Sequence, residues 1–198
     1  YNHRLAGHFV TLLKPSGVAV PVEAARQLKE VRYGQMIYGD KARIQVKKVL
    51  HGLMEAQIPV IVMKGWVHIS TLYADDHSQR FCEDVDLLVS PGDVDRAEAL
   101  LTGLGYTPAA EVAEGHNHRF TNAREYLFIE PSGGEYSRFL VGLHWGLTHY
   151  PAYDGRRVNI TELFERCKPV KVADEDVCRM ASEDEIVYLC AHLSLHHR

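Results

Sequence analysis

Two aspartates with one residue between them, Asp84 and Asp86, begin an apolar run in the segment RFCEDVDLLVSP, residues 80–91. The run is typical of a buried strand, and side chains alternate across a strand, so both carboxylates should point to the same side. Two like charges this close raise each other's pKa, and a cation between them removes the repulsion. The spacing therefore predicts a Mg²⁺ site, because Mg²⁺ is usually held by one or two carboxylates together with substrate phosphates. A solvent-exposed strand end that tolerates two acids is the competing interpretation.

Basic and glycine residues upstream of this pair indicate that a phosphate group would bind beside the cation. Lys64 and Gly65 follow the apolar run PVIVM and precede a helical pattern. A strand–glycine–helix turn offers backbone N–H groups at a helix N-terminus, and these attract phosphate. Arg80 lies four residues before Asp84 and could pair with a phosphate or with the acids. One region of the chain thus combines a predicted phosphate cradle with a metal-type acid pair.

The longer stretch VMKGWVHISTLYADDHSQRFCEDVDLLVSPGDVDRAEALLTGLGY resembles a bacterial family of uncharacterised nucleotidyltransferases, part of the DNA polymerase beta-like superfamily. The shared features are the K-G turn, an arginine followed by D-h-D-L-L-V (h apolar) and the later G-Y. Downstream, VGLHWGL and EDEIVYLCAHLSLHH resemble the family's H-W strand and the start of its C-terminal helical region. The resemblance covers roughly residues 55–197.

The resemblance implies a function for each of these side chains. Asp84 and Asp86 would be the catalytic, metal-binding residues, holding one or two Mg²⁺ ions that bridge the triphosphate of an NTP, with ATP as the first donor to consider. The residues implied to bind the nucleotide are Lys64, Gly65, Arg80 and His144. An acceptor hydroxyl or phosphate would attack in line, and pyrophosphate would leave.

The resemblance also implies a third metal-binding carboxylate on a later strand, two residues before the histidine of the H-W strand. That position is Gly142, which has no side chain to bind metal. Glu125 or Glu130, on the neighbouring hairpin strand, could replace it if the register brings one of them opposite Gly142. Otherwise the chain would bind nucleotide without turning it over.

Histidines offer several further candidates. His144 could contact phosphate or shuttle a proton, or it could simply pack beneath the hairpin. For His116 and His118, in GHNHRF, polar surface is favoured over a metal or substrate site. His192 and His196 have the spacing of a two-histidine zinc site, but no third ligand is evident, and a helix that packs against the core is favoured.

The elements that must position these residues predict an α/β (α+β) fold. Strands are expected at 59–63, at 84–89 and in a hairpin around PSGGEY, and helices at 21–56, after Lys64, at 90–105 and from Ser182 onward. Gly34 and Gly39 are candidate breaks in the first of these helices. We expect a minimal nucleotidyltransferase-type mixed sheet with helices on one face, plus N-terminal and C-terminal helical additions. The predicted regions are 1–57 (helical), 58–150 (core) and 151–198 (helical, and continuing beyond the end of this chain).

Composition limits the function classes. The 198 residues carry a formal net charge of −4, which argues against broad binding to a nucleic-acid backbone. No apolar run approaches the roughly 20 residues of a membrane-spanning helix, and no leader opens the chain, so we expect no membrane partner. Four cysteines lack zinc or disulfide spacing and predict free thiols in a cytoplasmic protein. Cys82 is expected to be a packing or loop residue.

Three hypotheses remain open at this level. The first is a magnesium-dependent nucleotidyltransferase that transfers NMP from an NTP to an unknown small-molecule, peptide or protein acceptor. The second is a degenerate member of the same fold that binds nucleotide or a partner without turnover. The third, a metal hydrolase that uses no nucleotide, is disfavoured by the predicted phosphate cradle.

Overall fold

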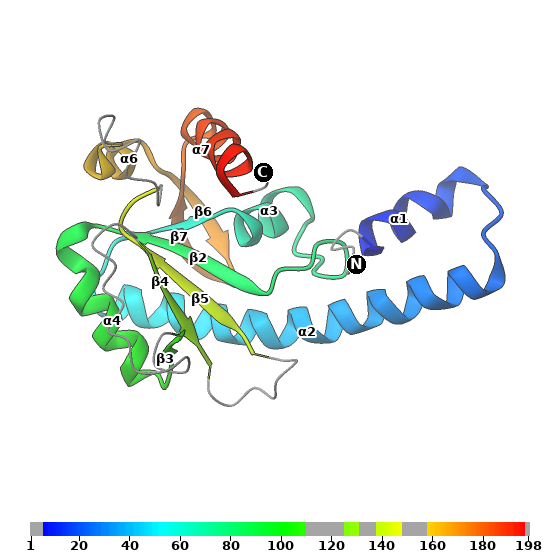
Figure 1. Ribbon diagram of the computed structural model, residues 1–198, viewed down its shortest axis with the longest axis horizontal. Helices are drawn as coiled ribbons and strands as arrows, with labels where there is room; N and C mark the ends of the chain where they lie inside the picture. Colours follow the sequence, from blue (N-terminus) through cyan, green and yellow to red (C-terminus); the bar gives the residue numbers. More distant parts are fainter. Residues whose placement is uncertain (1–5, 110–124, 131–137, 148–157, 197–198) are drawn as a thin grey trace.

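A mixed seven-stranded sheet organises the chain, in the order β3-β4-β5-β2-β1-β7-β6 (Figure 1). The computed structural model describes residues 6–109, 125–130, 138–147 and 158–196. The strands are β1 (Val60–Met63), β2 (Asp84–Val89), β3 (Thr107–Pro108), β4 (Glu125–Ile129), β5 (Leu140–His144), β6 (Lys168–Val172) and β7 (Glu175–Arg179). β2 pairs in parallel with β5 and β1 with β7, whereas the other pairs are antiparallel. The predicted mixed α/β fold is confirmed.

Helices flank this sheet on both faces. They are α1 (Ala6–Ser16), α2 (Val22–Glu55), α3 (Gly65–Leu72), α4 (Val94–Gly103), α6 (Ile160–Arg166) and α7 (Ser182–His196), with a 3₁₀ turn η1 (Pro91–Asp93) before α4. The central strands β1 and β2 are buried along their length apart from the half-buried Asp84 at the start of β2. A strand buried on both faces is mostly apolar, which explains the apolar run of β1 and the run Leu87–Val89 that follows the buried Asp86 in β2.

The main core lies between one face of the sheet and the helices α2 and α4 (Figure 1). The buried side chains on α2 recur at helical spacing and include Ala42, Val46, Val49, Leu50 and Leu53. They meet inward-facing residues of the strands, among them Val62, Val85, Leu87, Val141 and Leu143. The second half of α2 is therefore fixed against the sheet by its apolar face.

The first half of α2 extends beyond the sheet, where α1 lies along it (Figure 1). Contrary to the suggested breaks, α2 is continuous through Gly34 and Gly39. A Cβ at Gly39 would overlap the side chain of His77, so this glycine serves close packing of the 74–80 loop against the helix. None of the helices in the described ranges is long and apolar enough to cross a membrane.

The opposite face of the sheet carries a smaller core beneath the C-terminal helices α6 and α7. Its buried members are Ile61, Met63, Leu88, Ile160, Leu163, Met180 and Tyr188. These helices cover β1 and the end of β2 but leave the start of β2 and its neighbour β5 facing a cavity. The C-terminal helical addition thus forms one wall of the space in front of the acid pair.

The C-terminal region also adds a β-hairpin to the sheet. Its strands are β6, in the segment KPVKV, and β7, in the segment EDVCR. The turn between them places Ala173 and Asp174 at positive φ, 49° and 71°. Hairpin turns of this kind usually carry Asn-Gly or Asp-Gly, so Ala-Asp gave little local signal. β7 then pairs in parallel with β1.

Candidate active site

A cavity of about 430 Å³ opens beside the start of β2. One side of its wall carries cationic and backbone groups from the turn after β1 and the loop before β2, and the other carries acids and a histidine from β2, β4 and β5. Helix α7 supplies the remaining wall. The lining residues used below are Lys64, Gly65, Arg80, Asp84, Asp86, Glu125, His144, Tyr188 and His192.

The cationic end of the cavity is a strand–turn–helix unit. Strand β1 ends at Met63, Lys64 adopts φ 53° and ψ −125°, and α3 begins at Gly65. A positive φ is costly for a lysine and recurs at functional sites. Gly65 cannot be replaced without rearrangement, because a Cβ there would overlap the Sγ of Cys82. Cys82 is buried at this contact, as expected of a packing residue.

Arg80 approaches the same end of the cavity from the loop before β2. Its Nε is buried and has no hydrogen-bond partner among the described residues. A buried guanidinium nitrogen without an acceptor is costly. The loop is held in place by Asp76, which accepts hydrogen bonds from Ser78 N at 2.9 Å and Gln79 Nε2 at 2.8 Å.

The acidic end of the cavity is assembled by strand register. In β2 and β5, Asp86 lies opposite Gly142, and in β4 and β5, Glu125 lies opposite His144. Alternation along each strand then places Asp86, Gly142, His144 and Glu125 on one face. Leu127 is the residue opposite Gly142 itself.

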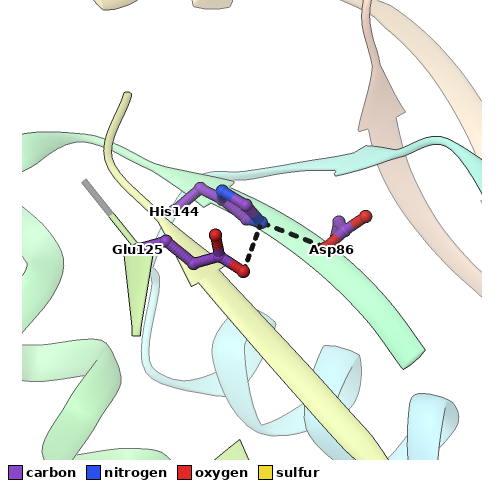
Figure 2. Close-up of side chains that lie close together, drawn as sticks. All are labelled: Asp86, Glu125 and His144. Carbon is purple, nitrogen blue, oxygen red and sulfur yellow. Dashed lines mark hydrogen bonds and ion pairs between the residues drawn. The ribbon is translucent and has the colours of Figure 1, made fainter. Parts of the chain in front are cut away.

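The side chains of Asp86, Glu125 and His144 converge (Figure 2). His144 Nε2 lies 3.0 Å from Asp86 Oδ1 and 3.6 Å from Glu125 Oε1. One ligand atom from each residue lies within 4.8 Å of the other two. His144 and Asp86 are buried and Glu125 is half-buried. Two carboxylates and one imidazole at these separations fit a single divalent cation after small side-chain movements.

Lys64 joins the two ends of the cavity. Its Nζ lies 3.0 Å from Asp86 Oδ2 and over the ring of Tyr188 on α7, 5.4 Å from the ring centroid. Burial opposes charge on both partners, but their mutual attraction outweighs it. The pKa of Lys64 is therefore raised above its usual range. For Asp86, burial alone would raise the pKa. The hydrogen bond and charge of His144, together with the charge of Lys64, outweigh burial and lower the pKa of Asp86 to about 2. Asp86 is held as a carboxylate.

Asp84 occupies a different place from its neighbour in the sequence. It lines the cavity one pleat away from Asp86, and its backbone oxygen accepts a hydrogen bond from Trp66 Nε1 at 2.9 Å. Within the described ranges, the three-residue cluster of potential metal ligands contains Asp86 but not Asp84. The two aspartates share a cavity, as the alternation predicts, but only Asp86 is in the cluster.

The two glutamates considered as replacements at Gly142 lie in different environments. Glu125 reaches the cluster with its side chain about one quarter exposed. Glu130 follows β4 and accepts a hydrogen bond from Gln45 Nε2 on α2, at 2.9 Å. The register brings neither glutamate opposite Gly142, but the side chain of Glu125, which is paired with His144, is the one that reaches the cluster. Hairpin register decides this, and sequence alone does not fix it.

Sequence reasoning missed the contribution of α7 to this site. Tyr188 covers Lys64, and Glu185 Oε1 lies 2.9 Å from His68 Nε2 on α3. The i, i+3 spacing of Glu185 and Tyr188 puts them on one side of a helix, but only the packing of α7 on the sheet brings Tyr188 to the cavity and Glu185 to His68. Helix α7 is thereby linked to both the helix and the lysine of the cationic end.

The other histidine predictions fall mostly outside this site. His116 and His118 lie outside the described residues, and so does the side chain of His196. His192 lines the cavity from α7. No cluster of metal ligands built on His192 occurs among the described residues.

Comparison with known proteins agrees with the geometry. A family model described as an uncharacterised nucleotidyltransferase matches residues 1–198. The chain belongs to this family. No curated protein matches. Among solved structures, the fold is similar to that of the antibiotic-resistance factor ANT(2'')-Ia, with a TM-score of 0.52 and 17% sequence identity. The match covers 79% of this chain and 74% of that chain. At this identity the likeness supports the nucleotidyltransferase fold alone.

Proposed function

We propose that this member of the nucleotidyltransferase family transfers NMP from an NTP to an acceptor and requires a divalent cation, Mg²⁺ being the ion that the family resemblance implies. The acceptor oxygen would form a bond to the α-phosphorus while the bond between that phosphorus and the bridging oxygen breaks. Pyrophosphate leaves, and the proton of an acceptor hydroxyl passes to solvent. The bound cation would offset negative charge on the phosphates as the bond breaks.

The observation that carries this proposal is the combination of opposed charges in one cavity. Lys64, Gly65 and Arg80 form the cationic part of its lining, where backbone N–H groups and positive charge suit the β- and γ-phosphates. Asp84 and Asp86 line the same cavity from β2, with Asp86 in contact with Lys64, and their carboxylates suit a metal ion. A triphosphate with its cation has the charge distribution that matches such a cavity.

Purified protein tests this directly. It would be incubated with ATP first and then each other NTP, with Mg²⁺ or Mn²⁺, and with a screen of small-molecule, peptide and protein acceptors. We expect pyrophosphate release and label from an α-labelled NTP on an acceptor, and loss of both in a double variant, Asp84→Asn with Asp86→Asn, that remains folded by circular dichroism. Absence of product across all donors, metals and acceptors would refute the proposal.

A second function is favoured by one residue, Gly142, where a metal-binding acid is expected. On that view the protein binds nucleotide or a partner in the cytoplasm without turnover. Isothermal titration calorimetry separates the two views. Metal-dependent ATP binding without pyrophosphate release supports the binding protein, whereas turnover excludes it.

A further inference from the structure

Three potential metal ligands meet directly above Gly142, which has no side chain. We infer that Asp86, Glu125 and His144 form the metal centre of this chain, with Glu125 in place of an acid at position 142, and that this centre binds Mn²⁺ in preference to Mg²⁺. The inference deepens the proposed function and rests on it for the use of the metal.

The space above Gly142 explains how the substitution works. A Cβ at this position would lie 2.7 Å from Asp86 Oδ1, 3.1 Å from His144 Nε2 and 3.4 Å from Glu125 Oε1. All three atoms therefore converge where a side chain at 142 would begin. The glycine leaves room for the Glu125 side chain to approach from the neighbouring strand β4. Glu125 thus supplies a carboxylate at the place where a side chain at position 142 would supply one.

The local charges support a cation at this point. Asp86 carries its charge in a buried position, and its Oδ2 is held by Lys64 while its Oδ1 faces His144 and the cluster. His144 Nε2 occupies the position between the two carboxylates (Figure 2). A bound metal would bridge the two carboxylates together with that nitrogen.

The donor set decides which ion is favoured. Mg²⁺ prefers oxygen ligands and retains its waters, so it gains little from an imidazole. Mn²⁺ binds carboxylates in the same octahedral geometry, and imidazole nitrogen is a better ligand for transition metals than for Mg²⁺. A centre with two carboxylates and one buried histidine should therefore discriminate between these ions. Asp84, one pleat away, remains for the cation that accompanies a triphosphate.

Electron paramagnetic resonance on nucleotide-free protein tests the site without activity. Titration with Mn²⁺ should reveal a bound ion, and spin-echo modulation should show coupling to a ¹⁴N nucleus from the imidazole. Mg²⁺ should displace the ion only at concentrations at least about tenfold higher. Lack of Mn²⁺ binding, lack of ¹⁴N coupling or equal competition by Mg²⁺ would each overturn the inference.

Two glutamates at opposite ends of β4 provide a matched pair of variants: Glu125 is its first residue and Glu130 follows its last. Glu125→Gln should weaken Mn²⁺ binding at least about tenfold, because loss of a mere outer-sphere partner already costs this much at metal sites. Glu130→Gln, beside Gln45 and outside the cluster, should bind Mn²⁺ like the wild type. Circular dichroism checks that both variants are folded. Equal Mn²⁺ affinity of Glu125→Gln and the wild type would refute the role of Glu125.

Gly142→Asp tests the substitution in the opposite direction. The new carboxylate must displace the ends of three flexible side chains, so it should compete with His144 for the ion. We expect weaker ¹⁴N coupling and a smaller ratio of Mn²⁺ to Mg²⁺ affinity. An unchanged ratio with unchanged coupling would count against the inference.

The failure of this inference can be told apart from the failure of the proposed function. If the wild-type protein transfers no nucleotide but keeps its Mn²⁺ signal, the proposed function is refuted and the metal centre stands.

Discussion

The two ends of the cavity are built in different ways. The cationic end comes from one continuous segment, in which β1, Lys64, α3 and the loop carrying Arg80 follow each other along the chain. The acidic end joins β2, β4 and β5, and Asp86 and His144 are 58 residues apart in sequence. A local unit keeps its geometry through its own turn, whereas an assembled one depends on the register of three strands.

This difference matters for how each end can vary. At the cationic end, Lys64 is held at a positive φ and Gly65 lies in close contact with Cys82, so few other residue types fit at either position. At the acidic end, a ligand absent from one strand can be supplied by its neighbour, as Glu125 beside Gly142 illustrates. Three changes would test whether the two ends are energetically separable.

The largest effect is expected at the acidic end, from Asp86→Asn. It removes the one carboxylate shared by the three-residue cluster and the D-x-D pair, so nucleotidyl transfer should fall at least about a hundredfold, the scale of losing one charge-stabilising group in an active site. Mn²⁺ binding to nucleotide-free protein should be lost as well. Steady-state rates and Mn²⁺ titration followed by paramagnetic resonance measure the two effects.

Asp84→Asn is the matched control for that change. It should impair transfer but preserve Mn²⁺ binding in the absence of nucleotide, because Asp84 lies outside the cluster. If both variants lost Mn²⁺ equally, the D-x-D pair would be the primary site, and the distinction between the two aspartates would be wrong.

An intermediate effect is expected at the cationic end, from Lys64→Met. Loss of a hydrogen bond from a charged group costs about 1.5–3 kcal/mol, so the Kd for NTP should rise about 10- to 100-fold. Mn²⁺ affinity without nucleotide should not fall, because the change removes a positive charge beside Asp86. Calorimetry measures both. The control is Lys48→Met, because the Lys48 ammonium donates to Leu104 O and lies over the Tyr106 ring, and Lys48 does not line the cavity. A matching loss of Mn²⁺ affinity would show that the ends are not separable.

The smallest effect is expected from Asp76→Asn, in the loop that carries Arg80. Burial raises the pKa of Asp76, but hydrogen bonds from Ser78 and Gln79 outweigh it and leave the pKa below its usual value. The charged form therefore stabilises the fold above about pH 4, the ordinary carboxyl range, and this contribution is lost as the pH falls below that range.

For this variant we expect a loss of about 0.5–1.5 kcal/mol in the free energy of unfolding at pH 7, typical of a single hydrogen-bonded side chain. The difference from wild type should shrink in acid, as urea unfolding at pH 7 and pH 3 would measure. Mn²⁺ binding should be unchanged. A difference independent of pH would mean that the loop is not held by the charge of Asp76.

Much of the architecture could be predicted because it is written in short-range patterns. The apolar runs of β1 and β2, the helical spacing of α7 and the turn signal between β4 and β5 each reflect the neighbours of a residue along the chain. The failures have a common cause. Helix α2 continues through Gly39, where His77, far away in sequence, packs against it, and β7 pairs with β1, which is more than 100 residues earlier in the chain.

The sequence by itself determined the type of chemistry at this site. Alternation along a strand put Asp84 and Asp86 on one side, and a strand–glycine turn with Lys64 placed a helix N-terminus nearby; both follow from backbone geometry within a few residues. Tertiary structure decided which side chains converge. Glu125 rather than Glu130 reaches Asp86 and His144 because the register of β4 against β5 fixes the direction of every side chain on the strand. That register depends on burial of Phe128 in the core, which no local pattern specifies.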